Sequence, residues 1–109
     1  YKIAIASNTY RYLIDSLNKT LDLSQYFGDH IYCIDDVSVG KPDPELFVLA
    51  LYKLNSLPEE SIVIGDSSSD FIAANNANIK CYGINTSYLL NNTFDNISLI
   101  SDFNDIKLE

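Results

Sequence analysis

Residues 61–70 read SIVIGDSSSD, a short apolar run that passes directly into a polar segment. A run of this length, rich in isoleucine and valine and bounded by polar residues, is typical of a buried strand over residues 61–65. A helix is expected next, from about Ser69 to Ala77. A strand that leads through a polar loop into a helix indicates a βαβ unit and therefore a parallel sheet.

The same alternation extends in both directions along the chain. Four further strands are expected, at residues 2–7, 31–34, 79–84 and 98–101. Leucine and isoleucine recur at helical spacing from about residue 10 to residue 20. A second helix is expected to open at Asp43-Pro44, with Asp43 as the cap and Pro44 in the first helical position. The sequence therefore predicts an α/β fold.

Composition and net charge limit the kinds of partner and the cellular compartment that are expected. The 109 residues suffice for one domain, and 7 basic against 15 acidic side chains give a net charge of −8. That charge disfavours nucleic acid and anionic membranes as partners, but it permits a phosphorylated small molecule at a local site. Without an apolar run of about 18 residues or a signal peptide, a cytoplasmic protein is expected. Cys33 and Cys81 are expected to be buried free thiols.

Polar segments follow three of the expected strands, and the carboxyl ends of parallel strands are where open α/β sheets bind ligands. In the segment after residues 61–65, Asp66 and Asp70 lie four residues apart around a strand-to-helix turn. Two carboxylates there suit Mg²⁺, which takes one or two of them and keeps waters or substrate oxygens. The alternative is structural, with Asp66 as a turn residue and Asp70 complementing the helix dipole.

The other two segments carry a lysine and a hydroxyl. Lys41 lies between a glycine and a proline, so its ammonium could neutralise a phosphate or a carboxylate, or it could be an ordinary solvated lysine. Ser7 and Asn8 end the first expected strand and lead into a helix N-terminus, an arrangement that suits an anion. Their structural alternative is that Asn8 or Thr9 caps that helix.

The order of these segments, together with three longer stretches, resembles a known family. The stretches are IASN at 5–8, DDVSVGKPDPELFVLAL at 35–51 and VIGDSSSDFIAANNANIKCYGI at 63–84. They are similar to the haloacid dehalogenase superfamily of phosphohydrolases, in the subgroup whose helical cap is inserted early, as in phosphoglycolate phosphatase and β-phosphoglucomutase-like enzymes. The resemblance implies a three-layer, Rossmann-like core.

The resemblance also implies roles for individual residues. Ser7 would hydrogen-bond the transferring phosphoryl group, Asn8 would help to shape the phosphate pocket, and Lys41 would offset the charge of phosphate and nucleophile. Asp66 would ligate Mg²⁺, and Asp70 would support the metal or its waters. The implied activity is Mg²⁺-dependent hydrolysis of small phosphorylated metabolites, such as sugar phosphates, through an aspartyl-phosphate.

One motif of the family is missing from residues 1–109. The nucleophile comes from an apolar strand followed by Asp-x-Asp, whereas Asp35 and Asp36 are adjacent. The resemblance thus implies the C-terminal part of a core domain, without the nucleophile strand or the cap, and inactive alone. The family places that strand between those matching residues 2–7 and 61–65. Its absence would leave two unpaired edges, so we expect self-association or pairing with the missing N-terminal half.

Other functions remain open at this point. A fold of this kind without its nucleophile could be a non-catalytic module that binds phosphate or a partner protein. A phosphomutase or a dehalogenase would share the same motifs. A phosphoacceptor receiver domain is disfavoured, because its acidic pair should follow the first strand and its lysine the last.

Overall fold

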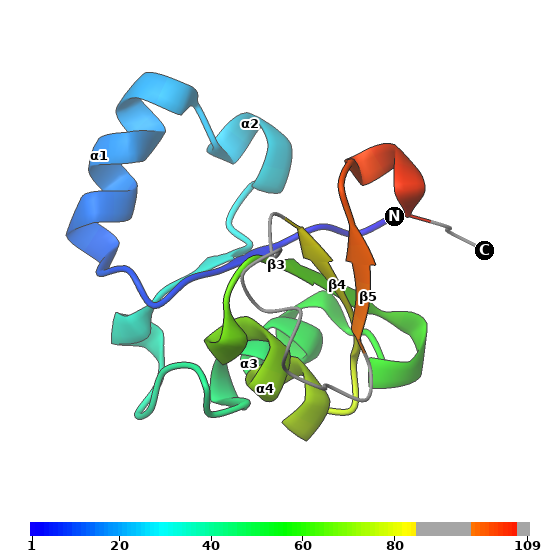
Figure 1. Cartoon of the computed structure of the whole chain (residues 1–109). Helices are drawn as coiled ribbons and strands as arrows, with labels where there is room; N and C mark the ends of the chain where they lie inside the picture. The colour runs from blue at the N-terminus through cyan, green and yellow to red at the C-terminus, as the bar shows by residue number, and fades with distance from the viewer. Residues whose placement is uncertain (85–96, 107–109) are drawn as a thin grey trace.

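The computed structural model describes residues 1–84 and 97–106 (Figure 1). The strands are β1 (Ile5–Ala6), β2 (Ile31–Tyr32), β3 (Ile62–Gly65), β4 (Lys80–Ile84) and β5 (Ile97–Ile100). The helices are α1 (Arg11–Leu21), α2 (Ser24–Phe27), α3 (Glu45–Leu54) and α4 (Ser68–Asn76). Short 3-10 turns lie at Ile34–Asp36, Pro58–Glu60 and Phe103–Asp105. Strands and helices alternate along the chain, as the sequence predicts.

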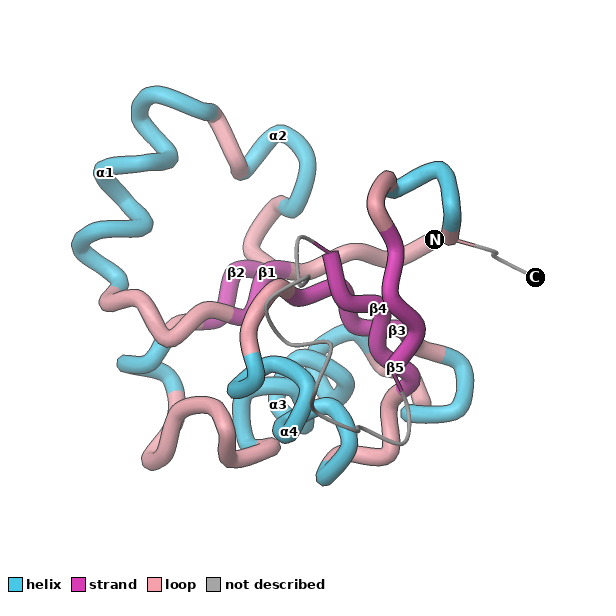
Figure 2. The backbone as a smooth tube through the Cα atoms, viewed as in Figure 1, coloured by secondary structure: helices cyan, strands magenta, loops and turns pink. Residues whose placement is uncertain are grey.

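The strands form two parallel sheets, which Figure 2 shows side by side. One sheet pairs β1 with β2, and the other has the order β3-β4-β5. The predicted parallel α/β class is confirmed. Among the described residues, β1 and β3 each pair with a strand on one side only. The sheet is therefore interrupted between them, where the family resemblance implies a further strand.

Helices α3 and α4 form one layer beneath both sheets (Figure 1). Phe47 of α3 and Phe71 of α4 belong to one buried cluster, against which Ala6 of β1 and Val63 of β3 pack. The opposite face of β1 and β2 is covered by α1 and α2, through a second cluster that includes Ile14. At β1 and β2 the sheet therefore has helices on both of its faces, which gives three layers.

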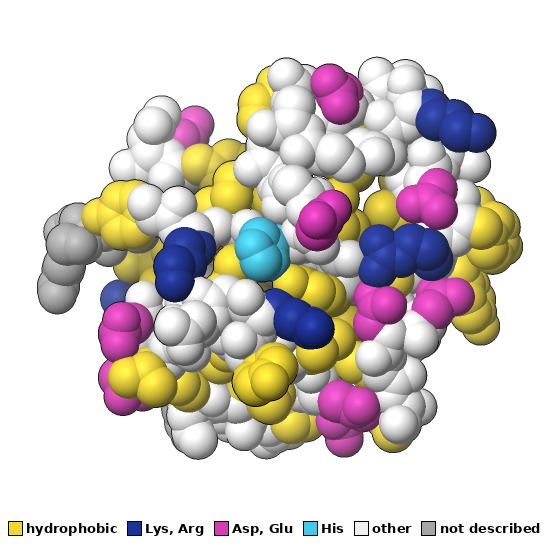
Figure 3. Space-filling model, turned by 180° about the vertical axis from the view of Figure 1, so that it is seen from behind, with side chains coloured by type: hydrophobic (Ala, Val, Ile, Leu, Met, Phe, Trp, Pro, Cys, Tyr) yellow, Lys and Arg dark blue, Asp and Glu magenta, His cyan; other side chains and the backbone are white. Residues whose placement is uncertain are grey.

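The sheet face on the side of α1 and α2 is less covered at β3. The side chains of Ile62 and Ile64 on this strand are 37% and 43% exposed. Large hydrophobic side chains are also exposed on α1, including Leu17 and Leu21. Figure 3 shows hydrophobic side chains interspersed with charged ones of both signs on another face. The expectation of self-association or pairing with an N-terminal half remains a prediction, and the open strand edges and these exposed side chains motivate it.

Element boundaries differ from the sequence expectations where pairing decides them. The strand expected over residues 2–7 is limited to β1, because only Ile5 and Ala6 are in register with β2. The strand expected over 31–34 ends at Tyr32, where the chain turns into the 3-10 segment. Helix α3 begins one residue later than expected. Asp43 still accepts a hydrogen bond from the backbone N–H of Glu45, at 3.0 Å.

No helix in the described part of the chain is both long enough and apolar enough to cross a membrane.

Candidate functional site

Lys41 connects the carboxyl ends of the two sheets. Its ammonium Nζ donates a hydrogen bond to the backbone carbonyl of Ala6, the last residue of β1, at 3.0 Å. It also donates to Oδ1 of Asp70, in the first turn of α4, at 2.6 Å. The lysine and this aspartate are 29 positions apart in sequence and meet because parallel strands end at one edge. The structure thus brings two of the expected site residues into direct contact.

The pair between Lys41 and Asp70 is largely withdrawn from solvent. Each side chain is only 11% exposed, and the Lys41 ammonium lies 5.6 Å from the centre of the Phe47 ring. Charges act over a longer range in such surroundings than in bulk water. The edge of the sheet therefore carries a fixed, charged pair beside a polar loop.

The loop that precedes α4 holds the second carboxylate oxygen of Asp70. Oδ2 accepts hydrogen bonds from the Ser67 hydroxyl at 3.0 Å, from the Asp66 N–H at 3.2 Å and from the Ser67 N–H at 3.4 Å. The Ser67 hydroxyl in turn caps α4. A Cβ at Gly65 would lie 2.5 Å from the Asp70 Cβ, so glycine is required at this strand end. The carboxylate of Asp70 thus fixes the shape of the loop.

Asp66 lies at the exposed end of β3 and could offer a hard oxygen ligand to a cation. Both oxygens of Asp70 already accept hydrogen bonds. Across residues 1–84 and 97–106, no three His, Cys, Asp or Glu side chains gather as a metal-binding group. Mg²⁺ takes only one or two carboxylates and keeps waters and substrate oxygens. These residues therefore fit one part of a magnesium site.

Ser7 is half-buried directly after β1, and its hydroxyl accepts a hydrogen bond from the Thr9 N–H at 3.1 Å. The structural alternative, that Asn8 or Thr9 caps the following helix, is wrong, because the N-cap residue of α1 is Tyr10. The N-terminus of α1 is instead capped from a distant segment, since the Asp35 carboxylate accepts from the Arg11 N–H at 2.7 Å. The Ser7 loop is thus shaped by contacts that cross between strands.

Asn8 contacts the backbone of Lys41. Its side-chain Nδ2 donates to the Lys41 carbonyl at 2.9 Å, and its Oδ1 accepts from the Lys41 N–H at 2.8 Å. Asn8, Lys41 and Asp70 therefore form one hydrogen-bonded group, and Ser7 directly precedes Asn8 in the chain. Asp66 joins it through its backbone N–H, which donates to Asp70.

Sequence reasoning missed a cluster beside this group. The Arg11 guanidinium forms an ion pair with Asp36 and donates to the Ile31 carbonyl at 2.8 Å. The Asp36 carboxylate also accepts from the Cys33 N–H at 2.8 Å. In the sequence, the only sign of this cluster is the pair of acids directly after a strand. That pair does not indicate which residue the acids contact. The cluster holds the start of α1 against the end of β2.

Cys81 lies on β4 beneath the site and has a shifted pKa. Burial, with a smaller contribution from the Asp70 charge, raises the pKa of its thiol from 9.0 to about 12. Above pH 9 the unfolded chain loses this proton, whereas the folded chain keeps it until about pH 12. The free energy of unfolding should therefore fall as the pH rises through this window, by about 1.4 kcal/mol per unit at most.

Urea unfolding at pH 8, 9, 10 and 11 under reducing conditions measures this dependence. In Cys81→Ala the slope above pH 9 should be smaller than in the unmodified protein, because Cys81 no longer contributes. Cys33, whose thiol pKa burial also raises, is present in both proteins and cancels. Equal slopes in the two proteins would show that Cys81 is not buried as described.

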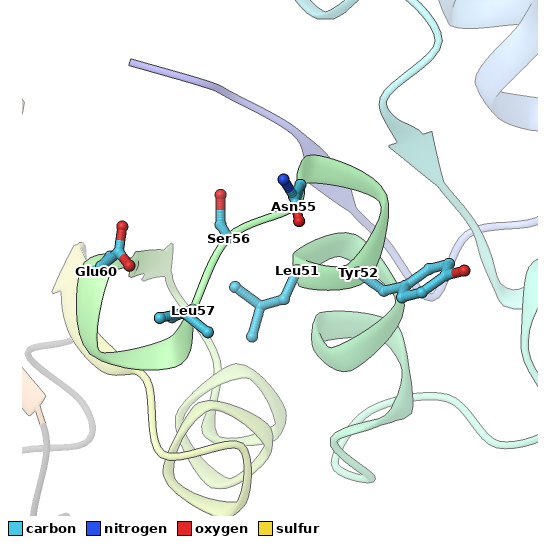
Figure 4. A pocket seen from close by; sticks show the side chains of 6 residues that line it. All are labelled: Leu51, Tyr52, Asn55, Ser56, Leu57 and Glu60. Carbon is cyan, nitrogen blue, oxygen red and sulfur yellow. The ribbon is translucent and has the colours of Figure 1, made fainter.

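A hollow at the other end of α3 does not belong to this group (Figure 4). Its lining comes from the last turns of α3 and the segment that follows: Leu51, Tyr52, Asn55, Ser56, Leu57 and Glu60. None of the residues expected from sequence to bind phosphate or metal lines it. The candidate site is therefore the group around Lys41.

Comparison with known proteins gives matches over most of the chain. The model of the haloacid dehalogenase-like hydrolase family matches residues 1–84. A phosphorylated carbohydrates phosphatase of Thermotoga maritima is 41% identical over 85 residues, which are 76% of this chain and 38% of that protein. Pyrophosphatase PpaX of Bacillus mycoides is 36% identical over 84 residues, 77% of this chain and 39% of that protein.

Solved structures agree with these matches. The crystal structure of CbbY from Rhodobacter sphaeroides in complex with phosphate superimposes with a TM-score of 0.80 at 26% identity. The match covers 95% of this chain and 48% of CbbY. The chain thus spans less than half the length of each of these three proteins.

Proposed function

The chain belongs to the haloacid dehalogenase-like hydrolase family, and from this premise we propose that the full-length protein hydrolyses small phosphorylated metabolites. The observation that carries the proposal is the buried contact between Lys41 and Asp70 beside Ser7 and Asp66. A cation held in place at the end of a parallel sheet suits a dianionic phosphate. The phosphatase and the phosphate complex among the relatives support the same substrate class.

We assign the binding of the phosphoryl group to Ser7 and Lys41. The Ser7 hydroxyl accepts a hydrogen bond from the Thr9 N–H, which leaves its own O–H to donate to a phosphate oxygen. The Lys41 ammonium, held by Ala6 and Asp70, offsets negative charge that grows as the phosphoryl group is transferred. Both groups are in place before substrate arrives, so little reorganisation is required.

We assign one magnesium ligand to Asp66. The Asp70 carboxylate accepts a hydrogen bond from the Asp66 N–H and so holds the Asp66 backbone in position. When bound, the ion would screen the repulsion between a phosphate and an anionic nucleophile. The carboxylate of Asp66 is exposed at the strand end, where substrate would approach.

We assign the attacking group to an aspartate outside residues 1–109. Residues 1–109 contain no apolar strand followed by Asp-x-Asp. An aspartyl-phosphate formed on that group would then be cleaved by water. The strand that carries it would fill the interruption between β1 and β3, beside Ser7 and Lys41.

The test is phosphate release by the full-length protein from a panel of sugar phosphates, other small phosphate monoesters and pyrophosphate. We expect turnover of sugar phosphates with Mg²⁺, loss of turnover after treatment with EDTA and recovery when Mg²⁺ is restored. Residues 1–109 alone, assayed in parallel, should release none. The proposal fails if the full-length protein hydrolyses none of these compounds, or if turnover is unaffected by removal of the metal.

A further inference from the structure

We propose that Asn8 is a positioning residue that holds Lys41 in place, and that Asn8 does not itself bind the phosphate. The family resemblance implies instead that Asn8 helps to shape the phosphate pocket. The inference rests on the proposed function, because it concerns how the lysine of that site is held. Asn8 then affects phosphate binding only by holding Lys41 in its position.

The two polar atoms of the Asn8 side chain are both used by one residue. Nδ2 donates to the Lys41 carbonyl at 2.9 Å, and Oδ1 accepts from the Lys41 N–H at 2.8 Å. This reciprocal pair resembles the exchange of bonds between residues opposite each other on adjacent strands. It ties the loop that carries the lysine to the end of β1, 33 positions earlier in sequence.

The close approach of the two loops depends on Gly40. A Cβ at this position would lie 2.7 Å from Oδ1 of Asn8 and would overlap with Cδ1 of Ile34. Any other residue would displace the Asn8 amide or the end of the Ile34 side chain, and would therefore disturb the contact between Asn8 and Lys41. The glycine that precedes Lys41 therefore has a packing reason, which is to admit the Asn8 amide.

The segment that holds the lysine backbone also holds its ammonium. The Ala6 carbonyl accepts from Nζ of Lys41 at 3.0 Å, two residues before Asn8 contacts the backbone. Lys41 is thus anchored at both ends to one short segment, with Asp70 completing the contacts of the ammonium at 2.6 Å. Releasing the backbone end should let Nζ leave its place above β1.

A double-mutant cycle on the full-length protein tests the proposal. Binding of inorganic phosphate in magnesium buffer is measured by calorimetry for the unmodified protein, Asn8→Ala, Lys41→Ala and the double variant. We expect Asn8→Ala to weaken phosphate affinity about tenfold when Lys41 is present. In the Lys41→Ala background the same change should have no effect, because the group it positions is gone.

A second asparagine provides a matched control. Nδ2 of Asn18 donates to the Ser24 hydroxyl at 2.8 Å, and its Oδ1 accepts from the Ser24 N–H at 2.9 Å. Asn18→Ala therefore removes the same number of hydrogen bonds between α1 and the start of α2, outside the site, and phosphate affinity should not change. If Asn8→Ala does not fold, Asn8→Gln keeps the amide and adds no charge, but moves the amide by one methylene relative to the Lys41 backbone, and its loss of affinity should likewise be absent in the Lys41→Ala background.

The outcomes separate the two proposals. An equal loss of affinity on both backgrounds would mean that Asn8 binds phosphate directly, and no loss on either would mean that it does not position Lys41. Either result overturns the inference while the effect of Lys41→Ala still supports the proposed function. If Lys41→Ala itself leaves phosphate binding unchanged, the proposed function fails, and the inference fails with it.

Discussion

Replacing Lys41 with alanine is expected to lower the turnover of the full-length protein by about a thousandfold. The Lys41 ammonium is a cation at the carboxyl end of the sheet, held by Ala6 and Asp70 in surroundings that exclude most of the solvent. A charge placed there before the reaction stabilises a phosphoryl group during transfer more than a mobile surface charge could.

Rates of phosphate release measure this effect, with Lys53→Ala as the control. Lys53 lies in the last turn of α3, at the far end of the helix from Lys41, and its side chain is exposed. The control should keep its turnover. Circular dichroism must show that Lys41→Ala is folded, because Asp70 then loses its partner. A folded variant with turnover within a few-fold of normal would remove Lys41 from the catalytic site.

Replacing Asp70 with alanine is expected to have the largest effect on stability, a loss of about 3–5 kcal/mol in the free energy of unfolding. The change leaves the Lys41 ammonium largely buried, 11% exposed, without its carboxylate. It also removes the acceptor that organises the Asp66 and Ser67 backbone ahead of α4. Removing one partner of a buried pair costs more than the pair itself contributes.

Urea unfolding of the full-length protein measures the loss, and Asp43→Ala provides the comparison. Asp43 is also an acid at the start of a helix, accepting from the Glu45 N–H, but it is exposed and pairs with no cation in the described structure. Its removal should cost about 1 kcal/mol. Similar losses in the two variants would mean that Asp70 acts only as a helix-start residue.

The alternation of strands and helices could be predicted from sequence because it depends on neighbours. The apolar runs at residues 31–34, 61–65 and 79–84 each contain a strand of the structure. The helices expected at about residues 10–20 and 69–77 begin and end within one residue of those positions. The helix α2 was not expected. Four residues offer too little periodicity to be recognised, and it is held against α1 by packing.

The location of the candidate site could also be predicted, because the carboxyl ends of parallel strands share one edge. Ser7, Lys41 and Asp66 all lie there. The role of Asn8 could not be predicted, since nothing near it in sequence shows that its amide is used by Lys41. The family motif named the residue as part of a pocket, and the structure shows what its side chain contacts.

Short stretches of sequence thus specify most of the strands and helices and the polar residues that follow them, because these features depend on neighbouring residues. The capping of α4 by Ser67 and Asp70 is local in the same sense. The contacts of Lys41 with Asp70 and with Asn8, across 29 and 33 positions, arise only when the whole chain folds. Such contacts depend on how strands are ordered and how closely loops approach, and packing of the whole sheet sets both.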